Sequence, residues 1–161
     1  MKEKELLSSL IKLMDPLQLI NWSCPIDEYN SEINKIYDYY KRNNDFNIIS
    51  KELDKCFNYA INNKFLLVEE LFKIYVSNQS INKDYIVKTL LEIWDPLAID
   101  NKTFNEYEYD IYVKKILDNY NLDGRCNEKF LVSLFLEWSP RKDMISIFNY
   151  LLSILIQHRK D

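Results

Sequence analysis

Apolar residues recur at spacings of three and four over residues 6–13 and again over residues 86–93. This period puts them on one face of an amphipathic helix. Each segment is followed by an Asp-Pro pair, and proline disfavours the α conformation of the residue before it. We therefore expect two helices that end just before Asp15 and Asp95. The residues that carry the pattern are Leu6, Leu7, Leu10, Ile11 and Leu13, and Ile86, Val87, Leu90, Leu91 and Ile93.

A second helix is predicted in each half of the chain, after a loop of some eight to ten residues. In the first half it should begin near Pro25, because proline suits the first position of a helix. In the second half, residues 103–106 form a capping box, Thr-Phe-Asn-Glu, which is a local helix-start signal. We expect these helices to run to about Tyr40 and Tyr120.

Two further helices are predicted in each half. A third helix should begin after Asp45 in the first half and near Asn127 in the second. The fourth should span residues 64–76, and in the second half it should open at the Ser-Pro pair 139–140. Residues 145–156 are apolar nearly all round, which is typical of a helix packed between others.

The two halves resemble each other when the sequence is shifted by 80 residues without a gap. This internal repeat predicts an all-α fold of about eight helices, formed by two tandem four-helix repeats, residues 1–80 and 81–161. Each repeat alone is small for a hydrophobic core, so we expect the two to pack as one compact unit. The identical positions include Asp15-Pro16-Leu17 with Asp95-Pro96-Leu97, Glu28-Tyr29 with Glu108-Tyr109, Lys35-Ile36 with Lys115-Ile116, and Tyr40 with Tyr120.

The composition supports helices and a cytoplasmic location. One glycine and four prolines in 161 residues are too few for the tight turns of an all-β fold or for phosphate-cradling loops. A net charge of −4 gives no overall attraction for nucleic acid or anionic lipid. We expect no membrane span and no secretory signal in the first 13 residues, since no long apolar run or cleavage pattern occurs.

Histidine and cysteine offer little for catalysis or metal binding. The one histidine, His158, lies beside Arg159 and Lys160, where a solvated helix end is the simplest interpretation. Cys24, Cys56 and Cys126 are widely spaced and lack the C-x-x-C pattern of zinc sites, so we expect reduced thiols. We predict no metal and no cofactor, and a protein that is not an enzyme.

Carboxylates are the remaining route to catalysis. Glu28 and Glu32 lie one helical turn apart, as do Glu106 and Asp110, and such pairs can act as acid and base or bind a divalent metal. The Glu-x-x-His pattern of di-iron bundles is absent. We expect solvated carboxylates near helix N-termini, where the helix dipole favours acids.

Asp15 and Asp95 are the duplicated acids most suggestive of catalysis. Aspartate before proline is, however, a common turn former whose side chain accepts hydrogen bonds from nearby backbone amides. We therefore expect a structural role for both.

Tyrosines beside acidic residues are the least ordinary feature of the chain. From Asp15 to Tyr40, and again from Trp94 to Asp110, five acids accompany one lysine. Tyrosine gives contact area at low entropic cost, and acidic clusters steer association with basic partners. The abundance of tyrosine is equally consistent with an AT-rich genome. The predicted partner-binding residues are Asp27, Glu28 and Tyr29, and Glu106, Tyr107, Glu108 and Asp110.

The repeated motif resembles the DUF1871 family of small helical bacterial proteins. The resemblance rests on Trp94-Asp95-Pro96-Leu97, then Tyr109-Asp110 and a helix with Val113 and Ile116. The first copy departs from the motif at Met14, in place of tryptophan, and at Asn30, in place of aspartate. The resemblance implies no catalytic residues. Small acidic helical proteins of this kind are similar to immunity proteins of polymorphic toxin and contact-dependent growth inhibition systems.

We therefore predict an immunity protein that binds and neutralises a cognate toxin domain through protein–protein interaction. The toxin would be a basic nuclease or other RNA-acting effector, and the bound chain would cover its active or substrate-binding surface. An alternative is a helical adaptor or regulator without a toxin partner. A third hypothesis is an enzyme that uses paired carboxylates and a divalent metal.

Overall fold

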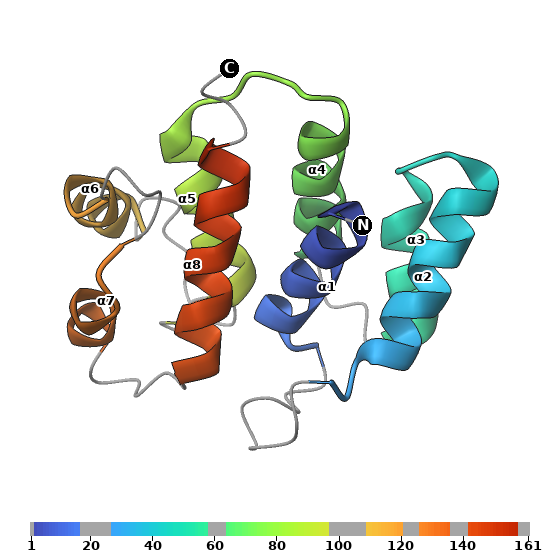
Figure 1. Ribbon diagram of the computed structural model, residues 1–161, viewed down its shortest axis with the longest axis horizontal. Helices are drawn as coiled ribbons and strands as arrows, with labels where there is room; N and C mark the ends of the chain where they lie inside the picture. The colour runs from blue at the N-terminus through green and yellow to red at the C-terminus, as the bar shows by residue number, and fades with distance from the viewer. Residues whose placement is uncertain are drawn as a thin grey trace, which may run out of the picture. The chain divides into compact units, whose positions relative to one another are not determined.

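The computed structural model describes residues 2–16, 27–57, 64–96, 109–120, 126–135 and 142–157, which form eight α-helices and no β-strand (Figure 1). The predicted all-α fold class is therefore confirmed. The chain divides into two compact units, Met1–Gln79 (unit 1) and Ser80–Asp161 (unit 2). The packing of the two repeats into one compact unit stays a prediction.

Unit 1 contains the helices α1 (Lys2–Met14), α2 (Asn30–Asn43), α3 (Ile48–Phe57) and α4 (Lys64–Val76). α1 packs against α2 and α4, and α3 packs against the same two helices. The predicted apolar face of α1 is buried, and Ile49, Leu53 and Phe57 of α3 are buried as well. Fully buried side chains in this unit include Leu6, Leu10, Ile11, Ile36, Ile49, Leu53, Val68 and Phe72.

Unit 2 contains α5 (Lys83–Trp94), α6 (Asp110–Asp118), α7 (Glu128–Leu134) and α8 (Lys142–Gln157). α5 packs against α6 and α8, and α8 also packs against α7. Within this unit α8 buries most of its length, as its apolar sequence predicts. Its buried side chains include Met144, Ile145, Phe148, Leu151, Leu152, Leu155 and Ile156.

The first helix of each unit ends where the Asp-Pro pairs predict. α1 ends at Met14 and α5 at Trp94. Asp15 and Asp95 follow in the left-handed conformation, with φ of 47° and 50°. Aspartate tolerates this region better than most residues, and the residue after a helix commonly adopts it. The Asp15 and Asp95 amides donate to carbonyls of the last turn, at 2.9 Å and 2.7 Å.

Several predicted helix starts lie outside the described residues, namely Pro25, residues 103–106 and residues 139–140. α2 begins at Asn30, after the turn residues 27–29, so the helix start predicted near Pro25 is about five residues too early. In unit 2, α6 begins at Asp110. The predicted starts of the third helices agree with the structure, because α3 follows Asp45 closely and Asn127 caps α7.

The predicted ends of the second helices are displaced by two or three residues. α2 continues past Tyr40 to Asn43, and Asn44 ends it in the left-handed conformation, with φ of 49°. α6 stops at Asp118, before Tyr120, which instead forms an isolated antiparallel bridge with Cys126. Asparagine tolerates the left-handed region better than most residues. Asn44 therefore marks the end of α2 more accurately than Tyr40, at which the end was predicted.

In both units, a polar residue of the fourth helix fixes the start of the third. In unit 1, the Ser50 amide donates to Glu69 Oε2 at 3.3 Å. In unit 2, the Asn149 side chain accepts from the Cys126 amide at 3.1 Å and donates to its carbonyl at 2.9 Å. These bonds join segments that are far apart in the sequence.

Candidate protein-binding surface

A tyrosine–aspartate hydrogen bond occurs at the same place in each unit. The Tyr29 hydroxyl donates to Asp15 Oδ1 at 2.6 Å, and the Tyr109 hydroxyl donates to Asp95 Oδ1 at 2.6 Å. Each bond joins the residue after the first helix to the residue before the second, 14 positions later. It therefore fixes both ends of the acidic loop predicted to bind a partner.

Tyr29 itself lies in the core of unit 1. Its side chain is 0% exposed, and its ring meets that of Phe57 edge to face at 5.7 Å. A fully buried ring offers no contact area to a partner, so the sequence-based prediction of Tyr29 as a binding residue does not agree with its position. Its place beside exposed acids made it resemble a surface aromatic.

Asp27 and Glu28 directly precede Tyr29, and both are exposed. The Asp27 carboxylate lies close enough to Lys12 of α1 to affect its titration. Burial lowers the pKa of Lys12, and the Asp27 charge opposes that shift. Asp27 thus interacts electrostatically with its own chain, and Glu28 lies exposed beside it.

Among the predicted binding residues of unit 2, Glu106, Tyr107 and Glu108 lie outside the described residues. Asp110, the first residue of α6, is exposed, and its Oδ1 forms an ion pair with Lys88 Nζ at 3.0 Å. Lys88 belongs to α5, so this ion pair links α5 to α6. The structure therefore places Asp110 in a surface ion pair.

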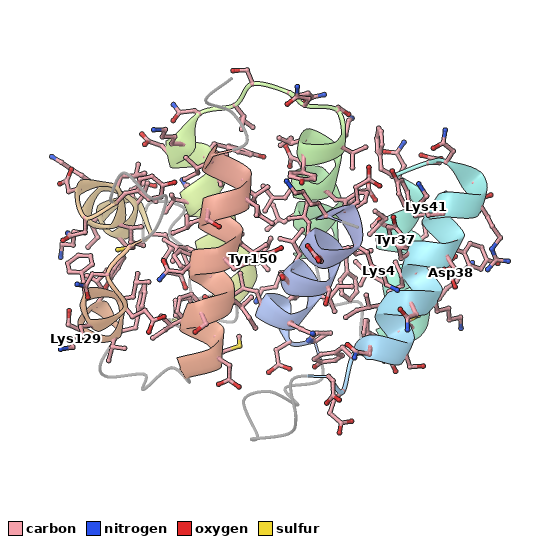
Figure 2. The ribbon with its side chains drawn as sticks, viewed as in Figure 1. Lys4, Tyr37, Asp38, Lys41, Lys129 and Tyr150 are labelled. Atoms are coloured by element: carbon pink, nitrogen blue, oxygen red, sulfur yellow. The ribbon has the colours of Figure 1, made fainter. Side chains whose placement is uncertain are left out.

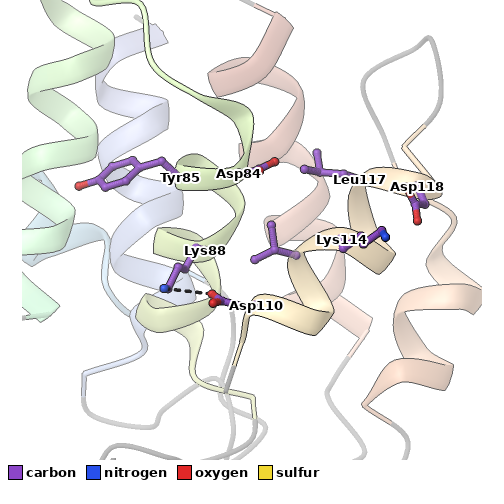
Figure 3. A pocket seen from close by; sticks show the side chains of 8 residues that line it. Asp84, Tyr85, Lys88, Asp110, Lys114, Leu117 and Asp118 are labelled. Atoms are coloured by element: carbon purple, nitrogen blue, oxygen red, sulfur yellow. Dashed lines mark ion pairs between the residues drawn. The ribbon is translucent and has the colours of Figure 1, made fainter. Parts of the chain in front are cut away.

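A groove runs between α5 and α6, with a volume of about 580 Å³ (Figure 3). The Lys88–Asp110 ion pair lies at one end, and Asp84 and Leu117 lie at the other. The groove is charged along its rim and has an apolar floor. Its lining residues are Asp84, Tyr85 and Lys88 from α5, and Asp110, Val113, Lys114, Leu117 and Asp118 from α6.

A smaller groove of about 290 Å³ lies between α1 and α2 in unit 1. Each of its lining residues has a counterpart 80 positions later in the groove of unit 2. The sequence repeat therefore recurs as a surface feature of both units. The residues that line the smaller groove are Lys4, Glu5, Ser8, Asn30, Ile33 and Asn34.

The carboxylate pair Glu28 and Glu32 does not form two solvated groups as predicted. Glu32 Oε2 is buried, and within the described residues it has no hydrogen-bond partner. Glu52 of α3 is buried nearby, with its Oε1 accepting from Lys55 at 3.2 Å. Both carboxylates act electrostatically on the half-buried Cys56, whose pKa is raised mainly by burial.

No group of three or more potential metal ligands occurs among the residues that the structure describes. Burial raises the pKa of the Cys126 thiol to about 11, so this thiol stays protonated at neutral pH and is a poor nucleophile. Cys24 and His158 lie outside the described ranges. The predicted carboxylate pair of Glu106 and Asp110 has only its second member described.

Two sets of interactions at these surfaces were not predicted from the sequence. The first is the hydrogen bond that each of the Asp15 and Asp95 carboxylates accepts from a tyrosine hydroxyl. Their constant spacing from Tyr29 and Tyr109 in the two copies was the available signal. Lys88 was also missed, because Ser8 replaces it in the first copy and the repeat therefore does not mark it.

Comparison with family models, curated proteins and solved structures found no match to this chain. In the described part of the chain, no helix has both the length and the apolar character that a membrane crossing requires.

Proposed function

We propose that this protein is an immunity protein, which binds a cognate toxin domain and covers its active or substrate-binding surface. The toxin would be a basic nuclease or another RNA-acting effector. The observation that carries the proposal is the tyrosine–aspartate bond beside exposed acidic residues, repeated in both units.

The repeated bond supports binding because it holds the acidic segments in place before a partner arrives. Tyr29 is buried and hydrogen-bonded, so the adjoining Asp27 and Glu28 start from a fixed backbone. A preorganised surface loses less conformational entropy on association than a loose one. Tyr109 places Asp110 in the same way in unit 2.

The charge of these segments favours a basic partner. Asp27, Glu28 and Asp110 are exposed, and the chain as a whole carries a net charge of −4. Complementary charge accelerates encounter and rejects partners of the same sign. An RNA-acting toxin needs a basic surface for its substrate, and an acidic protein can occupy that surface.

The proposal is tested by co-expressing the chain with the product of the adjacent gene, as the candidate toxin, and by measuring cell survival and complex formation. Glu28→Lys and the pair Glu106→Lys with Glu108→Lys should each weaken protection and slow association by about tenfold, because they repel a basic surface. Asp54→Lys is the matched control, since Asp54 is an exposed acid on α3.

Full protection by the charge-reversed chains would exclude these acidic segments as the binding surface. Failure of the wild-type chain to bind or to protect would reject the immunity function. It would then favour the alternative of an adaptor or regulator that acts on a different partner.

A further inference from the structure

We infer that the groove between α5 and α6 binds a lysine or arginine side chain of a protein partner. The bound cation would take the place that Lys4 of the chain itself takes in unit 1. This inference builds on the proposed binding of a basic partner and adds the site and the chemistry of one contact.

In unit 1, a lysine that lines the groove contacts an aromatic ring of the second helix. Lys4 Nζ lies 5.9 Å from the centre of the Tyr37 ring, so a cation from α1 covers an aromatic face of α2. Figure 2 shows the two side chains next to each other between these helices. A cation over the face of tyrosine is attracted by the electrons of the ring.

In unit 2, the counterparts of these two residues cannot form that contact. Asp84 stands in place of Lys4, and Leu117 stands in place of Tyr37. The groove of unit 2 reaches Leu117 and Asp118 (Figure 3), and its volume is about 580 Å³, against about 290 Å³ for the groove of unit 1.

The end of the unit 2 groove at Asp84, Leu117 and Asp118 has the negative charge and the apolar floor that a long cationic side chain requires. Three carboxylates and two ammonium groups line the groove, and Lys88 is engaged with Asp110 at 3.0 Å. The carboxylates of Asp84 and Asp118 therefore outweigh the remaining cation, Lys114. Val113 and Leu117 supply an apolar floor on which the methylenes of lysine or arginine can lie.

The test is an NMR titration of the full chain with the peptide acetyl-Leu-Arg-Leu-amide. The neutral control is the same peptide with citrulline in place of arginine, which keeps the shape and removes the charge. We expect amide shift changes at Asp84, Leu117 and Asp118, and at least about fivefold weaker binding of the citrulline peptide.

A double substitution, Asp84→Lys with Leu117→Tyr, places the residues of the Lys4–Tyr37 contact of unit 1 at the equivalent positions of unit 2. Unit 1 already holds this pair between its helices, so the change is compatible with the fold. We expect the affinity of this variant for the arginine peptide to be at least about fivefold lower than that of the wild type. The matched control is Asp54→Lys with Leu66→Tyr, the same changes at two exposed positions of unit 1.

Equal binding of the arginine and citrulline peptides would overturn the inference. So would shift changes that map outside the groove, undiminished binding of the arginine peptide by the Asp84→Lys, Leu117→Tyr variant, or no binding of either peptide. The peptide titration uses no toxin, so it fails or succeeds independently of the protection experiment. Asp84→Asn alone, which keeps the size of the side chain, should weaken the arginine peptide and leave the folded spectrum unchanged.

Discussion

At the scale of single residues, the tyrosine–aspartate pairs combine two roles that are usually separate. Asp15 ends α1 in a left-handed conformation, and its buried carboxylate then accepts the hydroxyl of Tyr29. A buried carboxylate is costly unless it is hydrogen-bonded, so the tyrosine stabilises the turn that the aspartate forms. The same combination recurs at Asp95 and Tyr109.

Removing one hydroxyl tests this account directly. Tyr29→Phe should lower the free energy of unfolding by about 1–3 kcal/mol, because it takes a donor from a buried acceptor. Tyr109→Phe should cost less, about 0.5–1.5 kcal/mol, since its bond is only partly buried. Urea denaturation measures both.

The control for these substitutions is Tyr39→Phe, which removes a hydroxyl from a half-buried ring of α2. Its free energy of unfolding should change by less than about 0.5 kcal/mol. If Tyr29→Phe is equally neutral, the bond does not hold the turn, and the argument for a preorganised acidic segment fails.

Sequence reasoning at this scale gave the turns but not the partners of the aspartates. The end of each helix before an Asp-Pro pair follows from local rules, whereas the bond to Tyr29 spans 14 residues. Burial of Tyr29 likewise depends on Phe57 of α3, a residue that nothing near position 29 identifies. The exposure of Asp27 and Glu28 agrees with their predicted place on the surface.

At the scale of helices, the elements whose limits depend on nearby residues were predictable. α1 and α5 end before Asp-Pro, α4 spans Lys64–Val76, and Asn127 caps α7. The end of α6 was not predictable from local signals, because Tyr120 forms a bridge with Cys126. This bridge depends on contacts that the sequence pattern does not contain.

Asn149 shows how a distant residue fixes an element. Its amide satisfies both backbone groups of buried Cys126, at 3.1 Å and 2.9 Å. Asn149→Leu has similar volume but leaves these groups without that partner, so it should destabilise the chain by about 1–3 kcal/mol. Hydrogen exchange at the Cys126 amide should accelerate by more than global unfolding alone explains.

For comparison, Ser153→Ala removes a polar group from the same helix, where the hydroxyl donates to the Tyr150 carbonyl at 2.7 Å on the surface. This variant should stay within about 0.5 kcal/mol of the wild type. If Asn149→Leu were equally mild, α7 would not depend on α8 for its starting position.

At the scale of the whole molecule, the two units share equivalent surface positions but differ in the side chains that occupy them. Each unit has its own core, its own tyrosine–aspartate bond and its own groove between its first two helices. Lys4 lines the groove of unit 1, and Asp84 stands at the equivalent position in the groove of unit 2. The internal repeat was recognised from the positions that the two copies share, so the structure was required to locate the positions at which their surfaces differ.

Under the proposed function, exposed acids on a fixed backbone capture a basic toxin domain. The most direct test is the association rate constant of the wild-type chain with the product of the adjacent gene, as the candidate toxin, at about 50 mM and about 500 mM NaCl. We predict a fall of at least about tenfold at the higher salt, and a much flatter response for Glu28→Lys. A rate constant that ignores both salt and charge reversal, or the absence of any complex, would contradict the claim.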